Sequence, residues 1–265
     1  MAWQDVPATA PSETFDYGPD PAHRLDFWKA RGYSARAPLI LFVHGGGWSR
    51  GSKDNATGRW KPSHFTALGY AFASIDYRLV PGASGEEQAA DVARAVKALA
   101  DRASRLGIDR RRVVLMGHSA GAHLVALVGT DERYLGQFGL SFADIAGVVP
   151  IDGAAYDIPA QMADAGGFMR PTYATAFGSN LARQRALSPV EHAAAPNAPA
   201  FLLLHVQRPD GVRQNKALAD ALREAGTDVE DAGFPGTGLM GHMEINRGLG
   251  DPSYPATAVV DGWLR

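Results

Sequence analysis

The chain has 265 residues, of which 46% are hydrophobic and 20% charged, and its formal net charge is −2. This length can bury the core of one large domain, and so small a charge gives no electrostatic reason to expect a nucleic acid or an anionic membrane as a partner. Because the sequence holds no cysteine, a disulfide scaffold, a thiolate nucleophile and a cysteine zinc site are excluded.

The first part of the chain predicts a cytoplasmic protein whose fold begins with strands. Residues 1–11 have neither a basic start nor an apolar run, so no signal peptide is expected, and no segment of the sequence reaches the length of a membrane span. Residues 14–17 and 24–28 are predicted as an antiparallel edge pair. The continuous apolar runs at 39–43 and 71–75 are typical of buried parallel strands.

From residue 88 onward, helices and strands alternate. Apolar residues between 88 and 103 recur at the spacing of one helix face. The segment 154–195 is rich in Gly, Pro, Ala and aromatic residues and is too long for a simple connection, so we expect a small lid or cap there. The alternation predicts one α/β domain over 1–265, with a mostly parallel central sheet and helices on both faces. Further strands are predicted at 113–116, 145–151, 201–206 and 227–234, and further helices at 120–128, 213–225 and 256–264.

A G-x-S-x-G pattern, Gly117-His118-Ser119-Ala120-Gly121, lies between the predicted strand 113–116 and the predicted helix 120–128. This is the context that a nucleophile elbow requires, because small residues allow a tight strand-to-helix turn that lifts the serine oxygen clear of the sheet. The turn also aims the N-terminus of the helix at the reacting centre, where developing negative charge is favoured. Ser119 is therefore predicted as a nucleophile.

A second glycine-rich turn, His44-Gly45-Gly46-Gly47-Trp48, follows the strand 39–43 at the same edge of the predicted sheet. Glycines there let backbone N–H groups approach a bound carbonyl without a side chain in between. The N–H groups of Gly45, Gly46 and Ala120 are predicted to form an oxyanion hole.

A serine nucleophile needs a base, and the base needs an acid to orient it. His242 follows the last predicted strand in the glycine-rich loop 236–243, so it is predicted to project from the edge that carries Ser119. Two acids are candidates. Asp210 is favoured on loop order, because it comes just after the strand 201–206, which precedes the strand that leads to His242. Asp152, which ends the strand 145–151, is the alternative.

Several short strings together resemble the bacterial α/β-hydrolase esterases of the hormone-sensitive-lipase and kynurenine-formamidase-like group. They are HGGGW at 44–48, DYRL at 76–79, GHSAG at 117–121, DGAAYD at 152–157 and GH at 241–242. The resemblance covers the chain from Phe15 to Leu264. It implies the α/β-hydrolase fold, with carboxylester hydrolysis through an acyl-enzyme and no metal or organic cofactor.

Carried over position by position, the resemblance gives Ser119, Asp210 and His242 the triad roles and Gly45, Gly46 and Ala120 the oxyanion role. The chain departs from the pattern at the acid loop, which is longer and basic here, with Arg208 and Pro209 before the acid.

A small-molecule ester is the predicted partner, with no nucleic acid, membrane or metal. The oligomeric state is left open, with a homodimer as one option. The G-x-G-x-x-G string at 236–241 is followed by too few residues for a nucleotide-binding unit, and no H-E-x-x-H is present. Substrate-lining residues are predicted at Trp48, His118, Tyr156, Phe168 and Tyr173.

The predicted activity is hydrolysis of short- to medium-chain or aryl esters by a serine carboxylesterase. An aryl-formamidase that cleaves N-formylkynurenine is an alternative, because the same triad performs that reaction. A non-catalytic small-molecule binder on the same fold is a third reading, disfavoured because a full set of triad residues is available.

Overall fold

One central sheet organises the computed structural model, which describes residues 9–32, 36–167 and 169–265. Its eight strands lie in the order β1-β2-β4-β3-β5-β6-β7-β8. The pairs β1–β2 and β2–β4 are antiparallel, and the other neighbours are parallel. The strands are β1 Glu13–Asp16, β2 Arg24–Trp28, β3 Ala37–Val43, β4 Ala71–Ile75, β5 Ile108–His118, β6 Ile145–Ile151, β7 Ala200–Val206 and β8 Asp228–Phe234.

The apolar runs form parallel strands because both faces of the sheet are covered. In β3, for example, Leu39, Leu41 and Val43 pack into the hydrophobic cluster on one face of the sheet. The alternate residues Ile40 and Phe42 pack into the cluster on the other face. The period of two therefore sorts a continuous apolar run into two separate cores.

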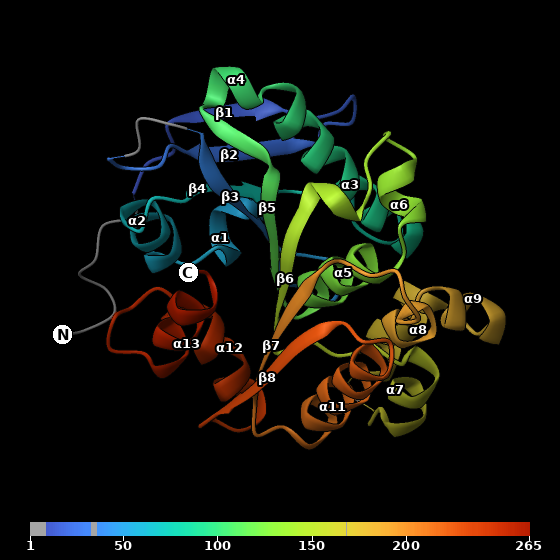
Figure 1. Cartoon of the computed structure of the whole chain (residues 1–265). Helices are drawn as coiled ribbons and strands as arrows, with labels where there is room; N and C mark the ends of the chain where they lie inside the picture. Colours follow the sequence, from blue (N-terminus) through green and yellow to red (C-terminus); the bar gives the residue numbers. More distant parts are fainter. Residues whose placement is uncertain (1–8, 33–35, 168) are drawn as a thin grey trace.

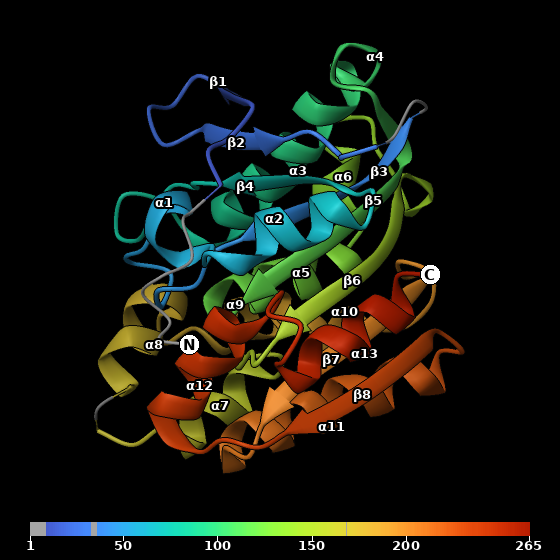
Figure 2. The same ribbon diagram turned by 90° about the vertical axis from the view of Figure 1, so that its left-hand side faces the viewer.

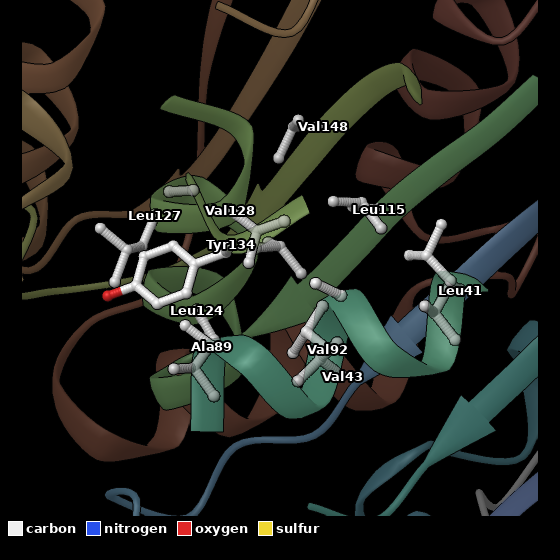
Figure 3. Close-up of a cluster of buried hydrophobic side chains, with 14 of the residues drawn as sticks. Leu41, Val43, Ala89, Val92, Leu115, Leu124, Leu127, Val128, Tyr134 and Val148 are labelled. Atoms are coloured by element: carbon white, nitrogen blue, oxygen red, sulfur yellow. The ribbon is translucent and has the colours of Figure 1, made fainter. Parts of the chain in front are cut away.

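Helices lie on both faces of the sheet (Figures 1 and 2). The first face is covered by α3 Gly85–Asp101, α5 Ala120–Thr130 and α11 Pro209–Glu224. The second face is covered by α2 Trp60–Ala67, α12 Gly238–Gly248 and α13 Pro255–Trp263. Figure 3 shows the first core, where side chains of α3 and α5 meet those of the central strands. The predicted α/β architecture with helices on both faces is confirmed.

The segment 154–195, predicted as a cap, joins β6 to β7 and carries four short helices among its described residues. They are α7 Ile158–Asp164, α8 Arg170–Phe177, α9 Leu181–Ala186 and α10 Pro189–His192. The remaining short elements are α1 Lys53–Ala56, α4 Ala103–Leu106, α6 Arg133–Gly136 and the 3₁₀ turn η1 Phe142–Asp144. In the described ranges, no helix combines the length and the apolar character that crossing a bilayer requires.

Two boundaries differ from the prediction in ways that affect the site. Helix α11 begins at Pro209 rather than at Arg213, because proline is well suited to the first helical position. The glycine-rich segment predicted as the loop 236–243 instead begins α12 at Gly238, with Thr237 as its N-cap. Asp210 and His242 therefore both lie on helices.

Candidate active site

The turn between β5 and α5 holds Ser119 in a backbone conformation that residues other than glycine rarely adopt, with φ 57° and ψ −117°. Glycines make the turn possible: a Cβ on Gly117 would lie 2.3 Å from the Gly121 carbonyl oxygen, and one on Gly121 would lie 2.1 Å from that of Val43. The Ser119 N–H donates to the Ile151 carbonyl at 3.0 Å. The tight strand-to-helix turn predicted from the glycine spacing is therefore present.

His242 lies beside this serine. Its Nε2 is 3.0 Å from Ser119 Oγ, and its Nδ1 is 2.6 Å from Asp152 Oδ2. Because a carboxylate only accepts hydrogen bonds, Nδ1 carries the proton and Nε2 is left to accept from the serine hydroxyl. The imidazole is thus in the tautomer that a general base needs.

A second histidine fixes the orientation of the first. His118 Nε2 donates to the His242 carbonyl oxygen at 2.9 Å, and the two ring centroids are 4.5 Å apart. Burial, and then the neighbouring His242, hold the pKa of His118 well below its usual range. His118 is therefore a neutral donor that packs beneath the base.

Asp152 is buried at the end of β6, and its carboxylate is fully paired. Oδ1 accepts from the Val206 N–H at 3.1 Å, while Oδ2 accepts from His242 and, at 2.9 Å, from Arg208 Nε. Burial alone would raise the pKa of Asp152. The His242 hydrogen bond and the charge of Arg208 outweigh burial, so the pKa is lowered and the carboxylate is ionised.

The prediction that Asp210 orients His242 is wrong, and the alternative acid, Asp152, holds that place. Asp210 lies in the first turn of α11, where its carboxylate is 3.1 Å from Arg208 Nη1 and 3.5 Å from Gln161 Nε2. The helix begins one residue earlier, at Pro209, and carries the Asp210 side chain away from the imidazole. Arg208 lies between the two carboxylates instead.

The three predicted oxyanion residues surround the serine. Gly45, Gly46 and Ala120 line the same pocket as Ser119, and a Cβ on Gly45 would lie 2.9 Å from the Ser119 Cβ. Ala120 is the first residue of α5, so its N–H is at the positive end of that helix. The three residues therefore border the nucleophile, and the predicted oxyanion role is compatible with their positions.

A pocket of about 950 Å³ opens over Ser119. Of the predicted substrate-lining residues, Trp48, His118 and Tyr173 line it. Tyr156 does not, because its ring is fully buried in the core below, against Gly153. Phe168 lies outside the described residues. Met169 also lines the pocket, together with Leu239 and Met243, which the sequence analysis did not single out.

Trp48 forms the aromatic wall of the pocket and is held from behind. Its indole Nε1 donates to His123 Nδ1 at 3.3 Å, and His123 Nε2 donates to the Leu187 carbonyl at 2.8 Å. The ring also packs edge-on against Phe177 at 4.7 Å between centroids. His123 is therefore a packed histidine, and burial lowers its pKa to about 4.

Lys61 is a buried residue next to the site that the sequence analysis missed. Its Nζ donates to the Thr57 carbonyl and to Asn246 Oδ1, each at 2.9 Å, and also to the Asn246 carbonyl. Burial lowers the pKa of Lys61 to about 7. Since Asn246 is one turn beyond His242 on α12, Lys61 fastens the helix that carries the base. Asn246 is 185 residues away from Lys61, so no local pattern indicates this contact.

Within 9–32, 36–167 and 169–265, no three His, Asp or Glu side chains gather in a way that could hold a metal ion. A second, smaller pocket of about 330 Å³ is lined by Pro38, Arg112 and Trp263. It lies at the opposite end of the strands, and it shares no lining residue with the pocket over Ser119.

Comparison with known proteins finds relatives that are named as esterases. LipC, an esterase of Mycobacterium tuberculosis, is 36% identical over 122 residues, which cover 44% of this chain and 30% of LipC. LipM, a probable carboxylic ester hydrolase of the same organism, is 29% identical over 221 residues, or 77% of this chain and 49% of LipM. The chain thus spans half or less of these relatives.

Among solved structures, esterase 2 of Thermogutta terrifontis, phosphoramylated by tabun, superposes with a TM-score of 0.76 at 22% identity, covering 98% of this chain and 96% of that one. This likeness shows a shared fold and confirms the predicted α/β-hydrolase architecture. The model of the BD-FAE family matches residues 25–222, which is well over half of the sequence. The chain therefore belongs to the BD-FAE family.

Proposed function

We propose that this chain is a serine carboxylesterase that works through an acyl-enzyme. The observation that carries the proposal is the line of contacts from Ser119 Oγ to His242 Nε2 at 3.0 Å and from His242 Nδ1 to Asp152 Oδ2 at 2.6 Å. The names of the relatives LipC, an esterase, and LipM, a probable carboxylic ester hydrolase, support the same activity.

The first half of the reaction forms the acyl-enzyme. Ser119 Oγ attacks the ester carbonyl carbon while its proton passes to His242 Nε2, and Asp152 stabilises the imidazolium that results. The backbone N–H groups of Gly45, Gly46 and Ala120 stabilise the negative oxygen of the tetrahedral intermediate. When the intermediate collapses, the ester C–O bond breaks, and Nε2 returns its proton to the departing alcohol.

The second half repeats these steps with water. Nε2 removes a proton from the water, whose oxygen attacks the acyl carbon, and the same N–H groups receive the second oxyanion. The bond to Ser119 then breaks, the serine regains its proton, and the carboxylic acid leaves. The enzyme returns to its starting protonation state.

The walls of the pocket support short- to medium-chain or aryl esters as substrates. The volume of about 950 Å³ is within the usual range for small-molecule sites. Trp48 and Tyr173 offer flat apolar surfaces, and Met169, Leu239 and Met243 add flexible ones. An acyl or aryl group of modest size can bury its apolar surface against them.

The test is the hydrolysis of a series of p-nitrophenyl esters of increasing acyl length by the wild-type protein, Ser119→Ala and His242→Ala. We expect kcat/KM to be highest for short or medium acyl chains and to fall by several orders of magnitude in both variants. N-formylkynurenine, assayed in parallel, should be cleaved with lower kcat/KM than the best ester. Ester turnover that survives in Ser119→Ala would refute the proposal.

A further inference from the structure

The first residues after β7 bring a guanidinium, not a carboxylate, to the acid of the candidate triad. Arg208 Nε donates to Asp152 Oδ2 at 2.9 Å, and Nη2 donates to the Asp152 backbone carbonyl at 3.3 Å. The Arg208 side chain is 16% exposed and lines the substrate pocket. One guanidinium therefore grips both the side chain and the main chain of Asp152.

Asp152 needs to be held in this way. Its backbone has φ 44°, in the left-handed region that residues with a side chain seldom occupy. Its own N–H donates to the Leu204 carbonyl at 2.6 Å. Because Arg208 binds the carbonyl on the other side of the same residue, it helps to keep Asp152 in the conformation that points its carboxylate at His242.

The same contacts make His242 and Arg208 share one carboxylate oxygen of Asp152. Oδ2 accepts hydrogen bonds from both His242 and Arg208, so the two donors compete for one oxygen. Asp210 in turn forms an ion pair with Arg208, in which its carboxylate is 3.1 Å from Nη1. Positive charge on Arg208 disfavours a protonated imidazole, and negative charge on Asp210 partly cancels that effect.

We propose that Arg208 is a positioning residue of the reaction, which holds Asp152 in place and, balanced by Asp210, sets how strongly Asp152 stabilises the protonated form of His242. This inference rests on the proposed function, because it assigns Arg208 a role in the same reaction. It also gives Asp210 a place in the site other than the one predicted for it: Asp210 acts on the base through Arg208.

Several other ionisable groups interact with this cluster or with its immediate neighbours. Burial raises the pKa values of Tyr156, Tyr173 and Tyr254 and holds that of His118 well below its usual range. These four groups therefore keep one charge state near neutral pH. None of the surrounding groups is changed in the Arg208 and Asp210 variants, so their contribution is the same in every pH profile that is compared. They are Lys61, His118, Tyr156, Tyr173, His205, Asp231, Glu244 and Tyr254.

The test is the pH dependence of kcat/KM for p-nitrophenyl butyrate with Arg208→Met and Asp210→Asn. Removing the positive charge should move the acidic limb of the profile to higher pH by about one pH unit, because the imidazole is then protonated more easily. Removing the negative charge of Asp210 should move the same limb to lower pH. Opposite shifts are not expected from residues that merely support the fold.

A second arm separates position from charge. Arg208→Lys keeps the positive charge but loses the planar guanidinium that contacts both the side chain and the main chain of Asp152. It should therefore leave the acidic limb near that of the wild type while kcat falls. Arg208→Ala should lose about 100-fold in kcat through misplacement of Asp152. Because Arg208 borders the pocket, millimolar guanidinium chloride should restore part of that activity, whereas sodium chloride at equal concentration should not.

Labelling with a fluorophosphonate separates failure of this inference from failure of the proposed function. Labelling of the wild type supports an activated serine whatever Arg208 does. If the wild type is labelled but the acidic limbs of Arg208→Met and Asp210→Asn coincide or move together, the role of Arg208 is refuted alone. Absence of guanidinium rescue in a folded Arg208→Ala would also count against it.

Discussion

Replacing Asp152 by asparagine removes a buried negative charge whose Oδ2 lies 2.6 Å from His242 Nδ1. A carboxylate and an imidazolium with charge centres about 4 Å apart attract by about 4 kcal/mol at an effective dielectric constant of about 20. Loss of this attraction corresponds to about 10³-fold in rate. The new amide can also donate to Nδ1, which moves the imidazole proton to Nε2, the atom that must accept the serine proton. We therefore expect kcat to fall by about 10⁴-fold.

The matched control is Asp210→Asn, an isosteric change at the other candidate acid. The Asp210 carboxylate is 31% exposed and contacts Arg208 rather than His242, so kcat should fall by less than about tenfold. Both variants are compared with the wild type by steady-state kinetics on p-nitrophenyl butyrate, with thermal unfolding as a check on folding. The assignment of the acid is refuted if Asp210→Asn loses as much activity as Asp152→Asn, or if a folded Asp152→Asn keeps a kcat near the wild-type value.

Three further predictions concern residues around the site. Burial lowers the pKa of His123 to about 4, so the unfolded chain binds this proton more readily and stability should drop as pH falls below about 6.5, by about 3 kcal/mol at pH 4. His123→Gln should remove that share in urea unfolding between pH 7 and pH 4, and an unchanged pH slope would contradict it. Lys61→Met leaves the oxygens of Asn246 and Thr57 without their donor and should lower both the unfolding free energy, by about 3 kcal/mol, and kcat; a variant as stable and active as the wild type would speak against this role. Gly121→Ala would place a Cβ 2.1 Å from the Val43 carbonyl oxygen and should destabilise by more than about 4 kcal/mol, whereas Gly262→Ala, with open space around it, should be tolerated in the same thermal melts.

The elbow and the sheet were predictable because their signals are local. The glycines at 117 and 121 lie within two residues of the serine that they serve, and apolar runs such as 39–43 carry the strand signal within themselves. The period of two in β3 then places its side chains in two cores without further information. Ser119 and His242 were therefore identified from the sequence and lie together in the structure.

The acid was not predictable in the same way, because two aspartates follow neighbouring strands, both give the chain order Ser, Asp, His, and the choice by loop order fell on the wrong one. What separates them is the backbone after β7. Pro209 starts α11 at once, so Asp210 turns with the helix, and Arg208 reaches a carboxylate 56 residues away. Tyr156 was also misplaced: its aromatic side chain would suit a pocket wall, but its ring packs into the core.

The most direct measurement of the central claim is mass spectrometry of the protein after reaction with a fluorophosphonate. An activated serine beside a neutral imidazole should give one adduct per chain, located on the peptide that contains Ser119, and the adduct should be absent from Ser119→Ala and strongly reduced in His242→Ala. A folded wild-type protein that stays unmodified, or that carries its adduct on another residue, would contradict the account.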